Sequence, residues 1–486
     1  MTREHIGLWC ADNIIRFTDR TIWPDTTPTA LLAHATTGGK TMVYVSDPSV
    51  LSGFMAHVTA HMPHNQHRAY MSWDAIVSKT GRFFMFSVMI DKDNWLKFHE
   101  VSNLLRDGYR VTLDEDDNTD TQLLDILRMY EHAGLAKITA GAASMSAYHG
   151  GDYPWYLSRF PQLESETKKT LHGGYIGGFM TAKEGHWGAA IDIDCNSMYP
   201  SILRDEFLPY GTPEHYDGEY KPDSDMPLHA DTMTFRADLK PDGYPFLGDG
   251  HTLTRGATRL TSTHGYITMT LTDIDQRLLE ENYDVSIYRR LGGWKFRQSK
   301  GFFTGFVDEW GTRKQRETGN RRQMAKLIMN ALVGKMAALP KGAVLMPKST
   351  DGKTLEWAPA TRDESTLKTD YLPVPMWVNA YARRRLIGVC RANAGRLIYA
   401  NTDGCILLGH EPPKACALHP TELGKWKISA EYDKVTILAL NRYQGWRTDG
   451  GVDVVMAGNL FRRPIPYDQF RHGVEVMDDY GTPVML

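Results

Sequence analysis

Runs of apolar residues, interrupted by polar turns, divide the first part of the chain into strands and a helix. Apolar runs predict strands at 7–11, 41–46 and 82–90, and apolar residues at helical spacing predict a helix over 121–135. The aromatic and polar stretch at 147–169 predicts a linker or a small connecting subdomain. The pattern therefore indicates a mixed α/β domain at this end of the chain.

The rest of the chain also alternates between strands and helices. Residues 228–300 predict short strands joined by turns, with one helix among them, and residues 302–337 are helical in pattern. An Asp-Gly turn within 340–370 predicts a hairpin, and a helix over 376–393 leads into a second hairpin at 397–408. Together these elements predict an α/β protein of several domains.

Composition is that of a globular protein, with 42% hydrophobic and 23% charged residues, and 486 residues leave room for about three domains. No apolar run reaches the ~18 residues of a membrane span, and the first residues lack the apolar stretch of a signal peptide. The five cysteines contain no CxxC pair, which predicts neither a zinc site nor a disulfide framework. We therefore expect a cytoplasmic protein without a membrane partner.

The net charge of −3 does not by itself indicate a nucleic-acid partner, but the basic residues are clustered. Residues 313–326 hold six Lys or Arg against one acid, and smaller clusters lie at 383–385 and 462–463. A lone cluster of this kind is usually a solvated surface. Enzymes that act on nucleic acids need local cationic channels more than a high overall charge, so the charge is compatible with such a partner.

Three short segments carry residue types that suit phosphoryl transfer. In chain order they are AIDIDCNSMYPS (190–201), KLIMNALVG (326–334) and YANTDG (399–404). This chemistry is served by two Mg²⁺ ions about 4 Å apart, held by carboxylates that converge from separate strands. Asp194, at the end of a predicted strand, and Asp403, in a tight turn, suit this task. Asp192 shares the strand face of Asp194 and is interpreted as a supporting or structural residue.

The helix in the second segment predicts a positive grip on a triphosphate. Arg322, Lys326 and Asn330 recur every four residues and share one helix face. Lys314 can face them from a neighbouring helix. An exposed basic helix is common in any protein, but the apolar run IMNALVG indicates that this helix packs closely on one side. Tyr199 can lie beneath a bound sugar and exclude a ribose 2′-hydroxyl, although a buried core tyrosine is the commoner role.

These segments resemble the motifs of family B DNA polymerases, and in particular of the protein-primed polymerases of phages with linear genomes. The pattern DxxSLYPS matches residues 194–201, KxxxNSxYG matches residues 326–334, and YxDTDS matches residues 399–404. YIGG at 175–178 is similar to the YxGG motif that joins the exonuclease and polymerase regions. The resemblance covers roughly residues 135–480.

The resemblance implies a right-hand polymerase with palm, fingers and thumb, preceded by an N-terminal ribonuclease-H-like exonuclease-type domain. The implied domains are a degenerate 3′–5′ exonuclease-like domain (1–150), a connecting region with the YxGG motif (151–180), the first part of the palm (181–301), the fingers (302–339), a second insertion formed by a hairpin (340–370), the second part of the palm (371–458) and the thumb (459–486). A first insertion lies at about 240–300. In relatives such insertions contact the priming protein and clamp DNA during strand displacement.

The resemblance also implies the roles of site residues. Asp194 and Asp403 are expected to hold two Mg²⁺ ions, for which Mn²⁺ can substitute, with the backbone carbonyl of Cys195 and a weak or indirect contribution from Asn401. Nucleotide binding is implied for Tyr199, Lys314, Arg322, Lys326 and Asn330. DNA binding is implied for Tyr175, Gly177, Gly178, Ser197, Thr402, Arg442 and Tyr443.

The implied partners are a DNA primer–template, dNTPs, a terminal protein that supplies the priming hydroxyl, and a single-stranded DNA-binding protein. We expect a monomer in the cytoplasm of a bacterial host, where it replicates a phage or mobile-element genome.

The polymerase motifs contain three departures from the family pattern. Asn401 stands where an aspartate is usual, which removes one negative charge near the metals and predicts weaker metal binding. Val333 replaces the tyrosine of KxxxNSxYG. Residues 441–443 (Asn-Arg-Tyr) replace the KxY motif near the primer terminus, where Arg442 or Lys434 can supply the missing charge.

The N-terminal region departs most from the family. Proofreading domains bring carboxylates from three motifs to two further metals. Here the first motif reads CADNII, the second offers only Asp47, and the third retains Asp120 but has Asp116 where a tyrosine is usual. The region is also shorter than in relatives. We therefore expect no 3′–5′ exonuclease activity, with Asp120 as a remnant of the site and the domain serving as a scaffold or single-strand guide.

Three hypotheses for the function remain at this point. The first is a DNA-templated DNA polymerase, primed by a terminal protein. The second is an enzyme of the same chemistry on another substrate, a reverse transcriptase or a template-independent terminal transferase. The third is a catalytically inactive nucleic-acid-binding protein, which Asn401 and the eroded N-terminal region favour. Retention of Asp194, Lys326 and Asp403 argues against it, because a binding protein does not need all three.

Overall fold

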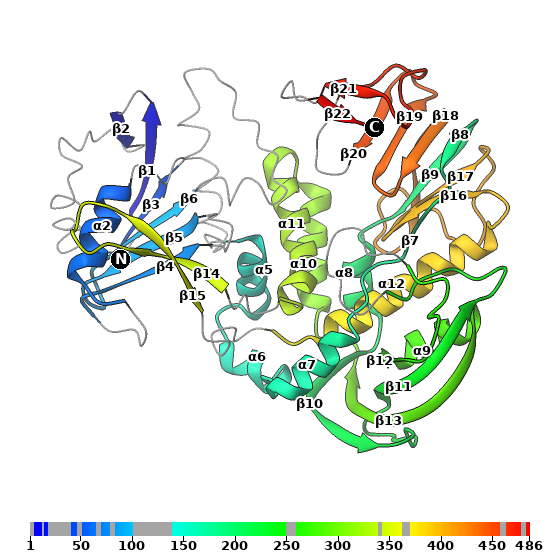
Figure 1. The fold of residues 1–486 in the computed structure, drawn as a ribbon, viewed down its shortest axis with the longest axis horizontal. Helices are drawn as coiled ribbons and strands as arrows, with labels where there is room; N and C mark the ends of the chain where they lie inside the picture. Colours follow the sequence, from blue (N-terminus) through cyan, green and yellow to red (C-terminus); the bar gives the residue numbers. More distant parts are fainter. Residues whose placement is uncertain are drawn as a thin grey trace. The chain divides into compact units, whose positions relative to one another are not determined.

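The computed structural model describes residues 4–11, 14–17, 40–45, 51–64, 70–77, 83–100, 139–248, 259–338, 343–361, 370–456, 463–477 and 483–486. The chain divides into two compact units (Figure 1). The first unit combines Met1–Tyr153 with Trp310–Asp370, and the second combines Pro154–Glu309 with Tyr371–Leu486. Each unit is therefore assembled from two separate parts of the sequence.

The first unit is built on a six-stranded sheet with the order β2-β1-β3-β6-β5-β4. Its strands are β1 (Glu4–Ala11), β2 (Ile14–Phe17), β3 (Lys40–Val45), β4 (Ser72–Val77), β5 (Phe83–Met89) and β6 (Trp95–Glu100). The pairs β1–β3 and β3–β6 are parallel, and the other pairs are antiparallel. The parallel pairs make this a mixed α/β unit.

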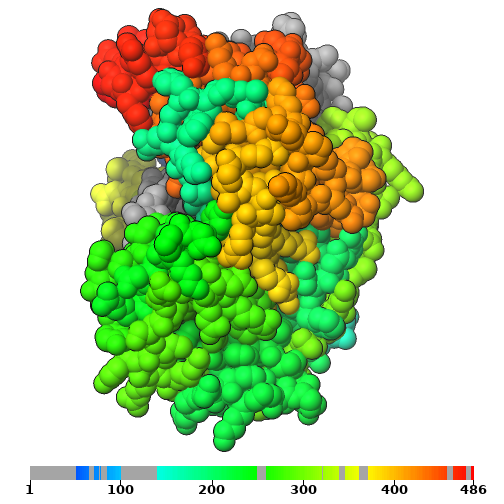
Figure 2. All heavy atoms as spheres, turned by 90° about the vertical axis from the view of Figure 1, so that its right-hand side faces the viewer, coloured from blue at the N-terminus to red at the C-terminus, as the bar shows by residue number. Residues whose placement is uncertain are grey.

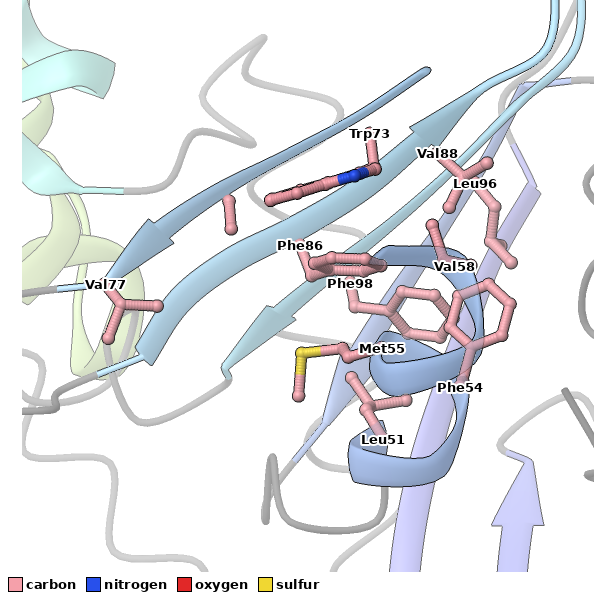
Figure 3. Packing of buried hydrophobic residues seen from close by; sticks show 11 residues of the cluster. Leu51, Phe54, Met55, Val58, Trp73, Val77, Phe86, Val88, Leu96 and Phe98 are labelled. Carbon is pink, nitrogen blue, oxygen red and sulfur yellow. The ribbon is translucent and has the colours of Figure 1, made fainter. Parts of the chain in front are cut away.

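One face of this sheet is covered by helix α2 (Ser52–His61), because apolar residues alternate along the strands and recur at helical spacing in the helix. The core that results contains Leu51, Phe54, Met55, Val58, Trp73, Ala75, Val77, Phe86, Val88, Leu96 and Phe98 (Figure 3). The ring of Phe54 packs edge-on against Phe86 and Phe98, with centroids 6.0 and 5.5 Å away. Burial of each side chain of this size stabilises the fold by ~1.5–3 kcal/mol.

A helical part and a hairpin complete the first unit. Its helices are α5 (Ala140–His149) and α11 (Gly319–Met336), whereas α10 (Thr304–Arg316) crosses the boundary between the units. The Ser144 hydroxyl donates to the carbonyl oxygen of Ile328 at 2.6 Å, which fixes α5 against α11.

The predicted hairpin is formed by β14 (Ala343–Lys348) and β15 (Glu356–Thr361). Its turn is closed by Asp351, whose carboxylate accepts from the backbone amides of Lys353 and Thr354, and Gly352 follows with φ 69°. The Asp-Gly turn predicted from the sequence is confirmed.

The second unit contains an eight-stranded antiparallel sheet with the order β20-β19-β18-β9-β17-β16-β7, which β8 extends by pairing with β18. Its strands are β7 (Met180–Ala182), β8 (Gly185–Trp187), β9 (Ala190–Cys195), β16 (Leu397–Asn401), β17 (Gly404–Leu408), β18 (Trp426–Ala439), β19 (Arg442–Arg447) and β20 (Val452–Met456). The central strand β9 pairs with β17 and β18. Residues far apart in the chain are thereby made neighbours.

A four-stranded sheet with the order β10-β13-β11-β12 forms the other part of the second unit. Its strands are β10 (Leu208–Asp217), β11 (Leu228–Leu239), β12 (Ile267–Thr272) and β13 (Tyr283–Ser299). The helices of this unit are α6 (Tyr153–Arg159), α7 (Ser165–Gly173), α8 (Met198–Asp205), α9 (Asp273–Asn282) and α12 (Pro373–Ala392). Helix α12 contacts α8, α9 and β10, and Figure 2 shows it in yellow beside the green four-stranded sheet. It links the two sheets.

The last described segment of the chain is a short hairpin, β21 (Glu475–Met477) and β22 (Pro483–Met485). Residues around it share a core with the ends of β18 and β20, through Leu438, Met456, Ile465, Phe470 and Leu486. The hairpin is therefore attached to the eight-stranded sheet.

Most predicted elements are confirmed, and one prediction was wrong. The strands predicted at 7–11, 41–46 and 82–90 are β1, β3 and β5, and the helical patterns at 302–337 and 376–393 are α10, α11 and α12. The expected short strands within 228–300 include β13, which runs for 17 residues. The difference arises because β13 pairs on both sides, with β10 and β11, so its length is set by partners that its own sequence does not reveal.

The segment expected as a linker or small connecting subdomain, 147–169, carries α6 together with the end of α5 and the start of α7, and the boundary between the two units falls within it. The helix predicted over 121–135 lies outside the described residues. None of the helices in the described ranges is long and apolar enough to cross a membrane.

Candidate active site

Asp194 and Asp403 lie next to each other at one end of the central strands of the eight-stranded sheet. Asp194 is the last residue but one of strand β9 and is paired in register with Gly404, the first residue of β17. The backbone amide of Cys195 donates to the carbonyl oxygen of Asp403 at 2.8 Å. The convergence of these two carboxylates predicted from the sequence is confirmed.

Both carboxylates line a pocket with a volume of about 250 Å³. The residues that line it are Asp192, Asp194, Tyr399, Asn401, Thr402, Asp403, Gly404, Cys405, Ser429, Tyr443 and Val455. The pocket thus collects residues from β9, the β16–β17 hairpin, β18, β19 and β20.

Negative charge is concentrated in this pocket. Burial, together with the smaller effects of the nearby Asp194 and Asp453 carboxylates and against the opposing effect of Lys427, raises the pKa of Asp192 to about 7. The Lys427 ammonium lies 3.1 Å from Oδ2 of Asp194. The hydroxyl of Thr402 donates to Oδ1 of Asp403 at 3.0 Å. Such a concentration of carboxylates favours binding of a cation.

The donor atoms of this pocket fit a hard cation such as Mg²⁺ or Mn²⁺ better than a metal that prefers thiolate ligands. Carboxylate oxygens are the ligands of a hard cation. The thiol that lines the pocket, Cys405, has a pKa that its hydrogen bond with Cys390 and burial raise well above the ordinary value, and burial raises the pKa of the Cys195 thiol to about 12, so neither offers a thiolate. Within the described ranges, no three His, Cys, Asp or Glu side chains are grouped to hold a metal ion. A site of two carboxylates suits Mg²⁺, which keeps positions for water and phosphate oxygens.

Three turns near the pocket have residues with positive φ values. Thr402, Ser197 and Asn441 have positive φ values of 54°, 51° and 58°, which are uncommon for residues other than glycine. The turn at Thr402 is held by its backbone amide, which donates to the carbonyl oxygen of Phe179 at 2.9 Å. Strained turns of this kind cluster at functional sites.

The YIGG segment packs directly against the β16–β17 turn. A Cβ atom added to Gly178 would lie 2.8 Å from Cγ2 of Thr402 and 3.1 Å from the hydroxyl of Tyr199, whereas one added to Gly177 would meet no atom within 4 Å. Gly178 therefore allows the backbone of this segment to approach the turn closely.

A buried arginine holds the backbone of the YIGG segment. Arg383, with a side chain only 1% exposed, donates to the carbonyl oxygens of Ile176 and Gly177 and forms a bidentate ion pair with Asp275. The amide of Asn379 donates to the hydroxyl of Tyr175 at 3.0 Å. Helices α9 and α12 thereby position the segment that contacts the pocket.

Asn401 is tied into a polar network beside the pocket. Its amide nitrogen donates to the side-chain oxygen of Asn441 at 2.7 Å and to the hydroxyl of Tyr399 at 3.2 Å. These bonds use the two N–H groups that an aspartate would lack. The side-chain oxygen of Asn401 remains as its one acceptor toward a cation.

Arg442 and Tyr443 both lie on β19, but only Tyr443 lines the pocket. The ring of Tyr443 is 5.0 Å from that of Tyr399, and burial, followed by the charge of Asp192, raises its pKa. Lys434, the other residue considered for the missing charge, lies 4.0 Å above the ring of Tyr467. That cation–π contact favours Arg442 for the role.

The predicted phosphate-binding residues belong to the first unit. Arg322, Lys326 and Asn330 are exposed on one face of α11, and the opposite face buries Ala325, Ile328, Met329 and Leu332. Val333 is also buried. Lys314, on α10, is partly buried. The stripe predicted from the sequence is confirmed as an exposed face, and its role toward the carboxylates of the second unit stays a prediction.

Sequence reasoning missed Lys427, because nothing near it in the chain marks it. It meets Asp194 only through the pairing of β18 with β9, which is not visible in local sequence. The three carboxylates weighed for the exonuclease site, Asp47, Asp116 and Asp120, lie outside the described residues.

The arrangement has counterparts among known proteins. A sequence model of the family described as DNA polymerase type B, organellar and viral, matches residues 133–416. The chain is 26% identical over 421 residues to the DNA polymerase of Bacillus phage M2, an alignment that covers 76% of this chain and 72% of the relative. It is 29% identical over 348 residues to the DNA polymerase of Bacillus phage phi29, covering 69% and 60% of the two chains.

Solved structures agree with these sequence similarities. Phi29 DNA polymerase in complex with primer-template DNA and incoming nucleotide substrates superposes with a TM-score of 0.82 and 20% identity, covering 100% of this chain and 99% of the other. The orthorhombic crystal form of that polymerase gives a TM-score of 0.80 with 21% identity, covering 99% of both chains. The right-hand fold, α/β and multidomain, is therefore common to both proteins.

Proposed function

Because the chain belongs to the DNA polymerase type B family, organellar and viral, and is a DNA-directed DNA polymerase, we propose that it transfers nucleotides by a two-metal mechanism at Asp194 and Asp403. The observation that carries the proposal is the adjacency of these two aspartates in one pocket. Oxygen donors, a protonated Cys195 thiol and a concentration of carboxylates support Mg²⁺ as the cation, with Mn²⁺ as a substitute.

In this proposal Asp194 and Asp403 hold the cations, with the backbone carbonyl of Cys195 and, more weakly, the Asn401 oxygen as further donors. When bound, two such ions stabilise the attacking and leaving oxygens of the displacement. The β16–β17 turn presents Asp403 in a fixed position because the backbone amide of Thr402 donates to the carbonyl oxygen of Phe179 and Thr402 packs against Gly178. The carboxylates are thus positioned before substrate arrives.

Nucleotide binding is proposed for Lys314, Arg322, Lys326 and Asn330, and sugar selection for Tyr199. Exposed cations on one helix face suit the phosphates of a dNTP. Tyr199 lies with its hydroxyl close to Gly178 and near enough to Asp403 for that charge to raise its pKa, after the larger effect of burial. A ring in that position can exclude a 2′-hydroxyl.

Template and primer binding are proposed for residues around the same pocket. They are Tyr175, Gly177, Gly178, Ser197, Thr402, Arg442 and Tyr443. The domain boundaries expected from the sequence, from the exonuclease-like part (1–150) to the thumb (459–486), are retained as part of this proposal. The solved complex of phi29 DNA polymerase with primer-template DNA and nucleotides supports these assignments by its similar fold.

Primer extension tests the substrate. We expect dNTP incorporation on a primed DNA template, and little on an RNA template or without template. Preference for RNA would favour a reverse transcriptase, and incorporation without template would favour a terminal transferase. The absence of any incorporation with Mg²⁺ or Mn²⁺ would instead favour a binding protein.

Initiation from a terminal protein is proposed from the resemblance to protein-primed polymerases and from the similarity to phage enzymes. Candidate terminal proteins encoded beside the gene provide the test. A labelled dNMP should become covalently attached to one of them in the presence of this chain. Initiation only from DNA 3′ ends would contradict the proposal. The same context suggests a monomer in a bacterial cytoplasm, aided by a single-stranded DNA-binding protein.

Lack of proofreading is proposed from the departures in the N-terminal motifs. A labelled single strand incubated with Mg²⁺ should remain intact. Digestion that disappears in Asp120→Ala would contradict the proposal, because it would show that the remnant carboxylate still serves an exonuclease site.

A further inference from the structure

The carboxylate of Asp194, a proposed metal ligand, forms an ion pair with a lysine side chain of the protein. Lys427 lies directly opposite Asp194 in the register of β18 and β9, and its ammonium is 3.1 Å from Oδ2 of Asp194. Both side chains are partly exposed, at 38% and 33%. The pair is therefore accessible to solvent, and one of its members, Asp194, lines the pocket.

We propose that Lys427 competes with the divalent cation for Asp194, and that its displacement sets the cation concentration that the enzyme requires. This inference rests on the proposed function, since it takes Asp194 as a cation ligand. A carboxylate oxygen that accepts from an ammonium has less electron density for a metal, and the ammonium repels a divalent ion placed close to it. Lys427 must therefore move when Asp194 binds the metal.

Lys427 also affects the stability of the protein when no divalent cation is bound. Asp192, Asp194 and Asp403 line one pocket, and repulsion among carboxylates that lie so close destabilises the fold. Lys427 offsets part of this charge through its ion pair with Asp194. Its positive charge stabilises the metal-free protein and weakens the metal-bound one.

The expected size of the effect follows from the exposure of the pair. A partly exposed ion pair contributes little, because solvent screens it. Removal of the ammonium also removes its repulsion of the divalent ion. Together we expect Lys427→Met to tighten cation binding by about 3- to 10-fold.

Binding of Mn²⁺ to the full chain, without DNA or nucleotide, measures this effect directly. The free ion is counted by electron paramagnetic resonance, so the readout does not depend on activity. Lys427→Met should bind Mn²⁺ more tightly, whereas Lys427→Arg should bind within about 2-fold of the unaltered chain, because it keeps the charge. Lys414→Met removes an exposed lysine from the same unit and is the control for net charge; it should leave binding unchanged.

A double-substitution cycle identifies the partner of the lysine. In an Asp194→Asn background, Lys427→Met should no longer tighten Mn²⁺ binding, because the carboxylate for which the lysine and the metal ion compete is absent. Thermal unfolding gives a second readout: Lys427→Met should melt below the unaltered chain without Mn²⁺ and gain more from its addition.

Unchanged or weaker Mn²⁺ binding in Lys427→Met would overturn the proposal, as would an equal gain in Lys414→Met. The variant Asp403→Ala distinguishes a failure of the proposal for Lys427 from a failure of the proposed function. If Asp403→Ala leaves Mn²⁺ binding unaltered, the metal site itself is wrong. If Asp403→Ala weakens binding but Lys427→Met does not tighten it, only the competing role of Lys427 is wrong.

Discussion

Gly178 lies against Thr402 so closely that a Cβ atom on the glycine would stand 2.8 Å from Cγ2 and 3.2 Å from Cα of the threonine. Atoms cannot stay this close together, and the backbone at Thr402 cannot move away without moving the turn that carries Asp403. The YIGG segment and the turn that carries Asp403 therefore form one packed unit, although more than 200 residues separate them in the chain.

Gly178→Ala should lower kcat by about 10- to 100-fold, because a displacement of catalytic groups by about 1 Å has effects of this size. Gly177→Ala is the matched variant, since its Cβ atom would meet nothing within 4 Å. It should keep kcat and alter only the affinity for primer–template. Steady-state kinetics on a primed template measure both, and equal losses of kcat in the two variants would contradict the packing argument.

Lys326→Ala should raise the apparent KM for dNTPs by roughly 10- to 150-fold, which corresponds to about 1.5–3 kcal/mol for a charged contact with phosphate. Arg321→Ala is the control, because Arg321 is also exposed on α11 but lies off the face shared by Arg322, Lys326 and Asn330. An unchanged KM in Lys326→Ala would reject the assigned role.

Tyr199→Ala should allow incorporation of ribonucleotides, since removal of the ring opens the space beneath the sugar. Tyr199→Phe keeps the ring and removes only the hydroxyl, so it should retain sugar discrimination. The ratio of kcat/KM for dNTP and rNTP is the quantity to compare. Full discrimination in Tyr199→Ala would show that another residue excludes the 2′-hydroxyl.

The first unit should lose stability in mild acid because of His99. This side chain is 6% exposed, and burial, with a smaller effect of Lys97, lowers its pKa from 6.5 to about 4. The unfolded chain therefore binds the proton more readily than the folded one, so stability is fully present above pH 6.5 and is lost as the pH falls toward 4. The loss at pH 5 should be about 2 kcal/mol.

Urea unfolding at pH 7.5 and pH 5, followed by tryptophan fluorescence, measures this loss. His99→Gln lacks the titrating group and should show a smaller decrease between the two pH values. An equal decrease in both proteins would assign the acid sensitivity to other residues.

Local sequence was enough to predict the parts of the site that depend on local structure. Asp194 lies near the end of a strand and Asp403 lies in a turn, and both features are visible in a few neighbouring residues. The exposed stripe of Arg322, Lys326 and Asn330 follows from helical periodicity alone. These features required no knowledge of the partners of each element.

The parts that were not predicted depend on pairing between distant segments. Lys427 meets Asp194 only when β18 pairs with β9, and Arg383 meets Asp275 only when α12 packs against α9. The length of β13 depends on two partner strands in the same way. No local pattern encodes such partners, so the electrostatic surroundings of the catalytic aspartates became visible only in the folded structure.

The proposed polymerase mechanism depends most on the joint role of Asp194 and Asp403, and Mg²⁺-dependent dNTP incorporation on a primed DNA template tests this role most directly. Asp194→Asn and Asp403→Asn keep the shape of each side chain and remove its charge. Loss of a metal ligand should exceed the 10- to 100-fold loss known for residues that only support a ligand, so we predict a loss of more than about 100-fold in each variant. Incorporation close to that of the unaltered chain in either variant would contradict the proposed metal-binding role of Asp194 and Asp403.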